Sequence, residues 1–389
     1  MSRAEKFCFS TTGDFELGFE HITRETEYSI VLPDSEPKGL VVYIPGFGGD
    51  SGDYRHKFCE KISEKYGLAV MTVDYHCLFS RPVLGAKTVY EKQDYLMIEK
   101  LFVQYGLPLG AVTDIDDAVN ILNEHLAKIG KEEQMLATLK PAKNEYQNGG
   151  ILAALDNINA VGDALKRWGI PEGNIILIGS SYGGYIANLA TKLAPNTFRA
   201  VFDNSSWANP NLDYIMGREL LRPEYSGYHH SNIQTCYFVR SGWTLETGLP
   251  NTFDENRMAI RDFTLEQVQQ FSTYKPNTFY YFMHCVNDHI ADTDKKIALA
   301  MDMLECGMTV HMLVMDKEDI DGQYVKNIDH GMGLSMVRFF ESAYQHIETH
   351  PPSEQTNFSK QSLITYQTPL FQYVFDYASL PVSARVVSL

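Results

Sequence analysis

The segment Gly179-Ser-Ser-Tyr-Gly183 has the residue types and spacing that can present a serine as a nucleophile. A predicted strand over 174–178 precedes this G-x-S-x-G motif, and a predicted helix over 184–190 follows it. A sharp turn from a strand into a helix lifts the serine oxygen above a sheet, and the flanking glycines let neighbouring backbone pass close by. We therefore predict that Ser181 is a nucleophile, with a purely structural glycine-rich turn as the alternative.

Asp288 is the predicted acid partner of this serine. A serine hydroxyl is a weak nucleophile, so it requires a base and a group that orients the base. When this motif is catalytic, the acid follows the serine along the chain and the histidine comes last. Asp288 follows the segment Phe279-Tyr-Tyr-Phe-Met-His284, which places it in a loop after a late strand. Two alternatives stay open: Asp288 could only cap the next helix, and Asp203, at the end of an earlier strand, could be the acid.

His330 is the predicted general base. It lies in Asn327-Ile-Asp-His-Gly-Met-Gly333, after the last predicted strand and before a predicted helix over 334–346. A loop at that place in the chain brings an imidazole to the sheet edge where the serine is expected. His284 and His289, on either side of the acid, are candidates for lining the pocket.

Two backbone amides are candidates for stabilising the oxyanion that forms during acyl transfer. The residue after the nucleophile supplies one, the amide of Tyr182, and the early loop Gly46-Phe-Gly-Gly49 supplies the other, the amide of Phe47. Loss of one such donor typically costs on the order of a hundredfold in rate. Gly46 and Gly48 are expected to line the same pocket. The loop lacks the Lys-Ser/Thr ending of a phosphate-binding loop and does not match G-x-G-x-x-G, which argues against a phosphate cradle.

These residues need a sheet whose strand ends meet at one edge. Short apolar runs alternate with helical patterns along the chain, which indicates an α/β fold with a mainly parallel sheet and helices on both faces. The alternation of Phe15, Leu17 and Phe19 predicts one further strand near the N-terminus, and residues 28–32 predict a second. The predicted buried strands cover 39–44, 68–73, 175–178, 200–202, 279–283 and 309–315.

Two stretches do not fit a minimal α/β core. Residues 79–148 and 205–276 each follow a strand at the sheet edge where ligands bind in such folds, so they are candidates for a lid. In the first stretch, Thr113 and Asp116 have the spacing of a capping box at the start of a helix that ends near Ile129.

The chain is expected to form one domain over residues 1–350, interrupted by these insertions. The C-terminal extension 351–389 is expected to pack on that domain because it is rich in aromatic side chains. The aromatic residues that indicate packing are Tyr366, Phe371, Tyr373 and Phe375.

Composition limits the partners. The 389-residue chain has a formal net charge of −16 and no basic run, which argues against nucleic acid and anionic membranes as partners. No stretch reaches the roughly 18 apolar residues of a membrane span, and the N-terminus does not read as a signal peptide. The six cysteines have no paired spacing, so we expect reduced thiols and a cytoplasmic protein. No cofactor or metal is expected, because H-E-x-x-H is absent and residues 316–322 have the wrong register for a calcium loop. The oligomeric state stays open.

Several of these motifs together resemble the α/β-hydrolase superfamily across roughly residues 10 to 347. They are Pro45-Gly-Phe-Gly-Gly49, Gly179-Ser-Ser-Tyr-Gly-Gly-Tyr185, Asn287-Asp288 and Asp329-His330-Gly331. This resemblance implies an α/β-hydrolase fold and a Ser–Asp–His hydrolase. The elbow Ser-Tyr-Gly-Gly is also similar to that of prolyl oligopeptidases.

Other segments resemble, more narrowly, a bacterial family known mainly as a domain of unknown function in Campylobacter-like bacteria. They are Asp74-Tyr-His-Cys77, Lys143-Asn-Glu-Tyr-Gln147, Asp203-Asn-Ser-Ser206 and Ile320-Asp-Gly322. This narrower resemblance implies no established substrate, and an association with the modification of surface or flagellar glycans is an expectation only.

The sequence thus predicts a serine hydrolase that acts on a carboxylic ester or acyl group through an acyl-enzyme. The expected substrate is a small-molecule or glycan-linked acyl group. An acyltransferase to a sugar hydroxyl, a prolyl-oligopeptidase-like peptidase and a non-catalytic interaction protein on a hydrolase scaffold are the alternatives.

Overall fold

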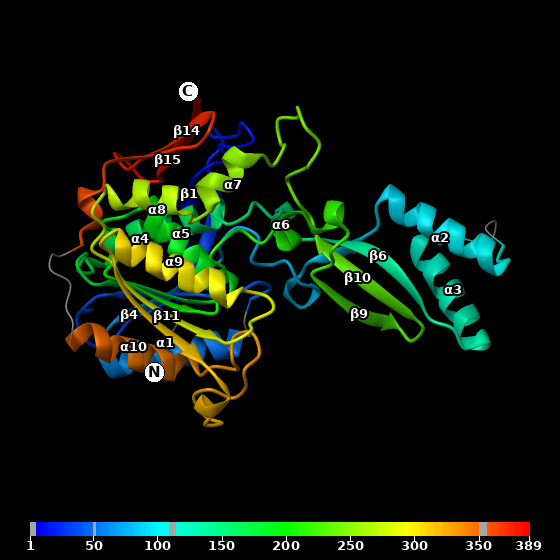
Figure 1. Cartoon of the computed structure of the whole chain (residues 1–389), viewed down its shortest axis with the longest axis horizontal. Helices are drawn as coiled ribbons and strands as arrows, with labels where there is room; N and C mark the ends of the chain where they lie inside the picture. The colour runs from blue at the N-terminus through cyan, green and yellow to red at the C-terminus, as the bar shows by residue number, and fades with distance from the viewer. Residues whose placement is uncertain (1–4, 50–51, 109–113, 350–355) are drawn as a thin grey trace. The chain divides into compact units, whose positions relative to one another are not determined.

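An eight-stranded sheet lies in the larger of two units of the computed structural model, which describes residues 5–49, 52–108, 114–349 and 356–389. Unit 1 is built from Met1–Leu78, Gly149–Pro210 and Thr247–Leu389. Unit 2 is built from Phe79–Asn148 and Asn211–Glu246. Figure 1 labels many of the elements of both units.

The sheet of unit 1 has the strand order β1-β2-β4-β3-β7-β8-β11-β12. Strand β2 pairs antiparallel with β1 and β4, whereas the pairs from β4 to β12 are parallel. The central strands are continuous apolar runs because both faces of the sheet are covered. The strands are β1 (Glu5–Thr11), β2 (Arg24–Val31), β3 (Leu40–Ile44), β4 (Ala69–Val73), β7 (Ile175–Ser180), β8 (Ala200–Asn204), β11 (Phe279–Cys285) and β12 (Thr309–Met315).

Helices cover both faces of this sheet. Helices α1 and α10 lie on one face, and α4, α5 and α9 lie on the other (Figure 1). The first face is packed by Phe58 and Ile62 of α1 and by Phe339 and Phe340 of α10, which meet Phe202 of β8. The strand order and the two helical layers confirm the predicted α/β-hydrolase fold. The helices of unit 1 are α1 (Gly52–Tyr66), α4 (Ile151–Trp168), α5 (Tyr182–Leu193), α7 (Glu255–Arg261), α8 (Leu265–Ser272), α9 (Thr293–Glu305) and α10 (Met336–Thr349), with short 3₁₀ turns η4 (Lys317–Asp319) and η5 (Phe358–Lys360).

The strand predicted from Phe15, Leu17 and Phe19 is wrong. The chain turns there: the amide of Phe19 donates to the carbonyl of Asp14 at 2.8 Å, and Gly18 has φ +79°. Phe15 is buried against the C-terminal extension, whereas Phe19 is 50% exposed. The alternating aromatic residues therefore lie in a turn, and Phe15 is buried because it packs against Tyr373 and Phe375, which are far away in the sequence.

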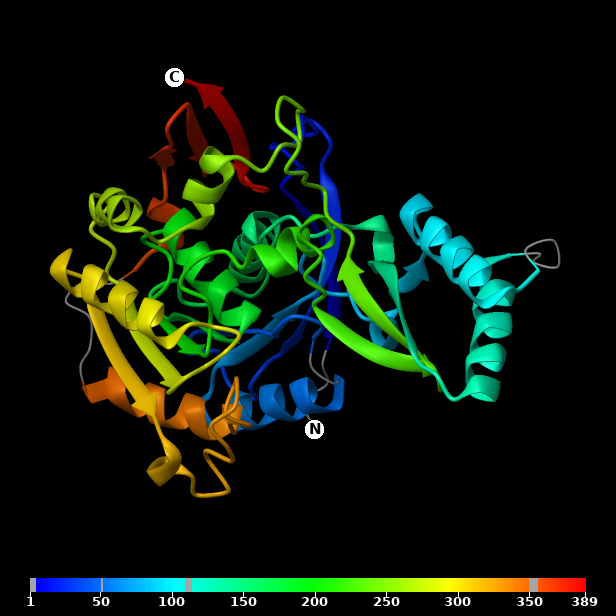
Figure 2. The same cartoon turned by 45° about the vertical axis from the view of Figure 1, so that its right-hand side comes forward.

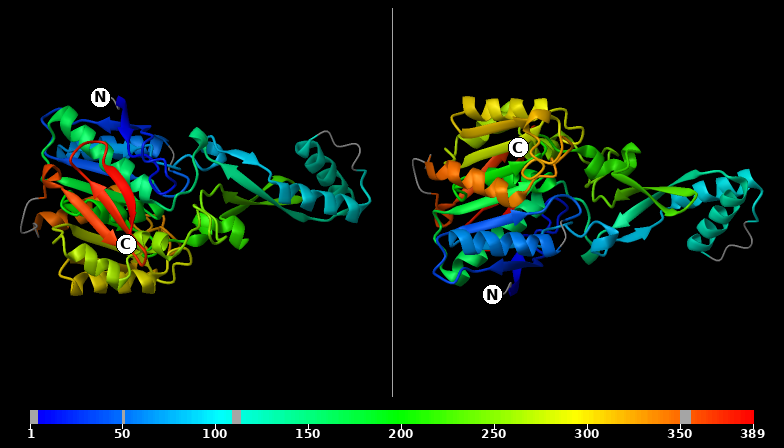
Figure 3. Two further views of the ribbon diagram at one scale, coloured as in Figure 1. Left: turned by 90° about the horizontal axis from the view of Figure 1, so that it is seen from above. Right: turned by 90° about the horizontal axis from the view of Figure 1, so that it is seen from below.

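A three-stranded antiparallel sheet forms most of the C-terminal extension and lies over the helices of one face (Figure 3). The Tyr366 hydroxyl donates to the carbonyl of Lys192 in α5 at 2.5 Å, and the Tyr373 hydroxyl donates to Glu16 at 3.1 Å. Residues 351–355 of the extension lie outside the described residues. The strands are β13 (Leu363–Gln367), β14 (Phe371–Asp376) and β15 (Ser383–Ser388).

Unit 2 has a four-stranded sheet and a small core of its own. Its helices α2 and α3 lie side by side (Figure 2), and Phe102, Leu122, Leu126 and Ile233 pack together in its core. The strand order is β5-β6-β10-β9. The elements are β5 (Lys87–Val89), α2 (Lys92–Tyr105), α3 (Ile115–Ile129), β6 (Glu133–Lys140), α6 (Leu212–Leu220), β9 (Tyr225–His230) and β10 (Ile233–Val239), with 3₁₀ turns η1 (Pro82–Leu84) and η3 (Ala142–Asn144).

Only residues 211–246 of the second predicted stretch, 205–276, belong to unit 2. Residues 247–276 belong to unit 1, where the guanidinium of Arg261 forms a buried ion pair with Glu16. Such a long-range pair has no local sequence signal.

Thr113 of the predicted capping box lies outside the described residues. The side chain of Asp114 caps α3 by accepting from the amide of Asp117 at 2.9 Å. None of the helices in the described segments is both long and apolar enough to cross a membrane.

Candidate active site

Ser181 occupies the turn between β7 and α5 with φ 54° and ψ −125°. A non-glycine residue with positive φ is strained, and such strain is typical of functional turns. The two glycines of the motif are required by packing. A Cβ on Gly183 would lie 2.0 Å from the carbonyl oxygen of Ile44, and one on Gly179 would lie 2.3 Å from the backbone of Gly183. The motif therefore lets the start of α5 touch the end of β3.

Ser181, His330 and Asp288 form one chain of hydrogen bonds. His330 Nε2 lies 2.7 Å from Ser181 Oγ, and His330 Nδ1 lies 2.8 Å from Asp288 Oδ2. An ionised carboxylate only accepts hydrogen bonds, so Nδ1 carries the proton of the neutral imidazole. Nε2 is then an acceptor for the hydroxyl of Ser181. This arrangement can move a proton from the serine to the histidine while the serine oxygen attacks.

Asp288 is buried but held in its ionised form. Burial raises the pKa of its carboxyl group, but hydrogen bonds from His330 and the amides of Ala291 and Ile290 outweigh this effect, so the pKa lies below its usual value. Both amides lie 2.9 Å from Asp288 Oδ1. A fixed negative charge therefore faces the imidazole on the side away from Ser181.

Asp203, the alternative acid, has different partners. Its carboxylate accepts from Lys296 Nζ at 2.5 Å, from the Ser206 hydroxyl at 2.5 Å and from the Asn188 amide at 2.6 Å. The carboxylate bonded to His330 is that of Asp288.

The structure separates the two candidate pocket histidines. His284 is fully buried, with Nε2 2.7 Å from the carbonyl oxygen of Ala291, and burial lowers its pKa, so the ring is a neutral donor. It belongs to the interior behind Asp288 rather than to the pocket, because β11 is covered on both faces. His289, in the loop after β11, lines a cavity together with His330.

The loop with Phe47 lies against the nucleophile turn. A Cβ on Gly46 would lie 3.0 Å from the carbonyl oxygen of Ser180 and 3.5 Å from the Ser181 side chain. The rings of Phe47 and Tyr182 meet edge to face at 5.4 Å, and Gly48 has φ +83°. Tyr182 is the first residue of α5, where a helix presents backbone amides and the positive end of its dipole.

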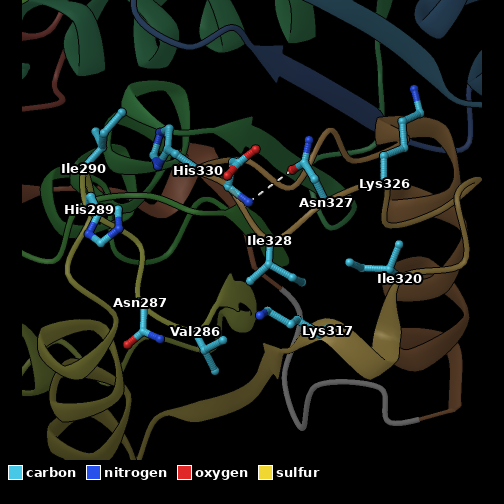
Figure 4. A pocket seen from close by; sticks show the side chains of 11 residues that line it. Val286, Asn287, His289, Ile290, Lys317, Ile320, Lys326, Asn327, Ile328 and His330 are labelled. Carbon is cyan, nitrogen blue, oxygen red and sulfur yellow. Dashed lines mark hydrogen bonds between the residues drawn. The ribbon is translucent and has the colours of Figure 1, made fainter.

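A cavity of about 830 Å³ opens beside His330 (Figure 4). His330, His289 and Ile290 stand on the left of this view, and Ile320 and Lys326 stand on the right. Sequence reasoning missed most of this lining, although apolar residues in loops next to Asp288 and His330 were an available signal. The cavity is lined by Val286, Asn287, His289, Ile290, Lys317, Ile320, Lys326, Asn327, Ile328, Asp329 and His330.

A family model described as "Protein of unknown function (DUF2920)" matches residues 5–383. The chain belongs to the DUF2920 family. No curated protein matches this DUF2920 chain in sequence.

The DUF2920 chain is similar to several solved structures at low identity. An acylaminoacyl peptidase from Pyrococcus horikoshii has 11% identity and a TM-score of 0.47, over 90% of this chain and 41% of the peptidase. The DUF2920 chain thus spans less than half of that peptidase. An esterase from Thermogutta terrifontis has 12% identity and a TM-score of 0.45, over 91% and 95% of the two chains. A putative dienelactone hydrolase from Klebsiella pneumoniae has 11% identity and a TM-score of 0.40, over 89% and 98%.

Proposed function

We propose that this protein is a serine hydrolase that cleaves a carboxylic ester or related acyl bond through an acyl-enzyme on Ser181. The observation that carries the proposal is the continuous chain of hydrogen bonds Ser181–His330–Asp288 at a strained strand-to-helix turn. Nucleophile, base and orienting acid are all within hydrogen-bonding distance, as acyl transfer requires.

The proposed reaction uses one proton relay twice. Ser181 Oγ attacks the acyl carbon while His330 Nε2 takes its proton, and the ionised Asp288 stabilises the imidazolium. His330 then gives the proton to the leaving alkoxide as the ester bond breaks. A water molecule attacks the acyl-enzyme, His330 takes the proton of that water, and Ser181 recovers a proton when the carboxylic acid leaves.

The amides of Phe47 and Tyr182 are the proposed donors to the tetrahedral oxyanion. This proposal is supported by the contact between the Phe47 loop and the turn that carries Ser181. Donors held in place before the reaction stabilise the charge that develops on the oxygen, and each is worth roughly a hundredfold or more in rate.

The cavity beside His330 is the proposed place for an apolar part of the substrate. Val286, Ile290, Ile320 and Ile328 give it aliphatic walls next to the proposed base. A series of p-nitrophenyl esters of increasing acyl length tests this proposal with the wild type and with Ile328→Trp. A bulky side chain there should shift the preference to shorter esters; an unchanged preference would exclude the cavity.

A fluorophosphonate probe tests the proposed nucleophile. We expect the probe to label the wild type but not Ser181→Ala, and we expect p-nitrophenyl acetate turnover to vanish in Ser181→Ala and His330→Ala. The exposed residues Ser231 and His56 provide the matched controls Ser231→Ala and His56→Ala, which should keep the wild-type rate. Persistent labelling of Ser181→Ala would refute the assignment.

Among the alternatives, transfer of the acyl group to a sugar hydroxyl would use the same acyl-enzyme. No contact among the described residues favours transfer or peptide cleavage over hydrolysis. A purely structural role fits less well, because such a role does not require the hydrogen-bonded arrangement of Ser181, His330 and Asp288.

The glycan-linked substrate and the narrower likeness to a Campylobacter-type bacterial family also remain proposals from sequence resemblance. We propose that the protein acts in the cytoplasm. In support, all six cysteines lie in the described residues and are free thiols, which suits a reducing compartment.

A further inference from the structure

The segment Asp203-Asn-Ser-Ser206, at the end of β8, contacts the nucleophile turn, the loop of His330 and the two elements that flank the acid loop, β11 and α9. All four of its residues are buried. Strand β8 lies between β7, which leads into the nucleophile turn, and β11, which leads into the acid loop. The segment is thus placed where it can fix the three catalytic residues relative to one another.

Asn204 holds the nucleophile side. Its carbonyl oxygen accepts from the amide of Ser181 at 2.8 Å, and its side-chain Nδ2 donates to Ser180 Oγ at 3.0 Å. These contacts hold the strained residue Ser181 and the residue before it.

Asn204 and Ser205 also hold the histidine side through a closed ring of hydrogen bonds around Gly331, the residue after His330. The amide of Gly331 donates to Ser205 Oγ at 3.2 Å, and the Ser205 hydroxyl donates to Asn204 Oδ1 at 3.2 Å. Asn204 Nδ2 uses its second hydrogen to donate to the carbonyl oxygen of Gly331 at 3.3 Å. Both polar backbone groups of Gly331 are therefore bound.

The residues of the ring and their neighbours are also hydrogen-bonded to β11 and α9. Ser205 has φ +55°, and its amide donates to the carbonyl of Met283 in β11 at 2.9 Å. Directly before and after the ring residues, Asp203 and Ser206 both bind the ammonium group of Lys296, at 2.5 and 2.9 Å. Lys296 belongs to α9, the helix that follows the acid loop. The same segment thus connects the nucleophile turn and the histidine loop with β11 and α9, the two elements that flank the loop of Asp288.

We propose that Asn204 and Ser205 are positioning residues that hold the His330 loop against the nucleophile turn, so that His330 Nε2 stays within hydrogen-bonding distance of Ser181. The loop needs such a clamp because Gly331, Met332 and Gly333 all have positive φ, and two of the three are glycines with wide backbone freedom. A misplacement of about 1 Å at a reacting group can cost about a hundredfold in rate. The inference rests on the proposed function.

Two variants and one matched control test the clamp. Asn204→Leu removes the amide at similar volume. Ser205→Gly removes the hydroxyl without placing a Cβ at positive φ. Asn159→Leu is the control, because Asn159 is equally buried and its side chain makes three hydrogen bonds, to Thr11, Thr12 and Val382. Thermal unfolding of each variant shows how much of an effect is loss of stability.

We expect Asn204→Leu and Ser205→Gly to lower kcat for p-nitrophenyl acetate about tenfold to a hundredfold with little change in KM. Fluorophosphonate labelling should slow by a similar factor at a temperature where each variant is folded. Asn159→Leu should lose comparable stability and keep its kcat. Equal activity losses in Asn204→Leu and Asn159→Leu, or wild-type kcat in both ring variants, would overturn the inference.

A readout that needs no substrate separates this inference from the proposed function. The proton between His330 Nδ1 and Asp288 should give a downfield ¹H NMR resonance that disappears in Asp288→Asn. We expect it to broaden or shift in both ring variants and to stay unchanged in Asn159→Leu. If the wild type neither turns over esters nor reacts with the probe, the proposed function fails, and this resonance still decides whether the clamp positions His330. An unchanged resonance in the ring variants would refute the clamp.

Discussion

At the scale of single residues, the site depends on one buried carboxylate that keeps its charge. Burial opposes ionisation of Asp288, and three hydrogen bonds from His330, Ile290 and Ala291 reverse the balance. The ionised group fixes the proton of His330 on Nδ1 and so leaves Nε2 facing Ser181. Charge, tautomer and proton acceptance are therefore linked through one side chain.

Replacement of Asp288 by Asn should remove this link while the fold persists. An amide can donate to Nδ1 and so favours the tautomer in which Nε2 carries the proton and cannot accept one from Ser181. We expect kcat for ester hydrolysis to fall about a thousandfold to ten-thousandfold. Steady-state kinetics with p-nitrophenyl acetate measures the loss, and the exposed Asp294→Asn is the control. A loss below tenfold would mean that Asp288 does not orient the base.

The positions of Ser181, Asp288 and His330 could be predicted from sequence because each follows a strand end, and parallel strands end at one edge of a sheet. The roles of these residues in catalysis stay predictions until the variants are measured. The clamp could not be predicted in the same way, since Asn204 and Gly331 are 127 positions apart. A buried asparagine has no local pattern that names its partner. The burial of His284 could not be predicted either, because it depends on the elements that cover β11 and not on the residues next to His284 in the sequence.

At the scale of elements, the turn between β1 and β2 places acidic groups in the interior. Asp14 is buried, and burial together with repulsion from Glu16 raises its pKa to about 6 despite the attraction of Arg24 and Arg261. The turn owes its shape to backbone hydrogen bonds and to packing of Phe15 on the C-terminal extension, which explains why alternation alone misassigned it as a strand.

The raised pKa of Asp14 predicts a pH dependence of stability. The folded protein holds this proton up to about pH 6, whereas the unfolded chain loses it near pH 4. The free energy of unfolding should therefore fall by about 2–3 kcal/mol through this group as pH rises from 4 to 6. Asp14→Asn should match the wild type at pH 4 and exceed it by about 2 kcal/mol at pH 7.

Urea unfolding of wild type and Asp14→Asn at several pH values measures this difference. The exposed Asp34→Asn variant is the control and should follow the wild type at each pH. A stability difference that does not change with pH would show that Asp14 does not titrate in this range.

The contact between the start of α5 and the end of β3 makes a second prediction at this scale. In Gly183→Ala, the new Cβ would lie 2.0 Å from the carbonyl oxygen of Ile44, and backbone cannot move aside cheaply. We expect a stability loss of about 1–3 kcal/mol or more and a displaced Ser181. Labelling by the fluorophosphonate probe should slow at least tenfold. Gly52→Ala, in the first turn of α1 with open space around it, should change neither quantity by much; wild-type labelling of Gly183→Ala would contradict the packing argument.

At the scale of the whole molecule, the chain divides its residues between two units with separate cores. Ser181, Asp288 and His330 all belong to unit 1, and unit 2 packs its own cluster around Leu122 and Phe102. The sequence indicated that residues 79–148 and 205–276 stand outside a minimal α/β core. It could not show that 247–276 returns to unit 1, because that return is stabilised by long-range contacts such as Arg261 to Glu16. The lid role of unit 2 stays a prediction.

The separate cores predict that unit 2 can be destabilised without loss of the nucleophile's reactivity. Leu122 is fully buried in α3, so Leu122→Ala should cost about 2–5 kcal/mol in unit 2. Calorimetry should show an earlier transition for unit 2 and an unchanged one for unit 1. Between the two transitions, the small fluorophosphonate probe should still label Ser181 at the wild-type rate.

The same experiment tests the predicted lid role of unit 2. A lid would act on larger substrates, so the ratio of long-chain to short-chain ester turnover should change at that temperature while labelling persists. If labelling of Ser181 were lost when unit 2 unfolds, the reactivity of the site in unit 1 would depend on folded unit 2.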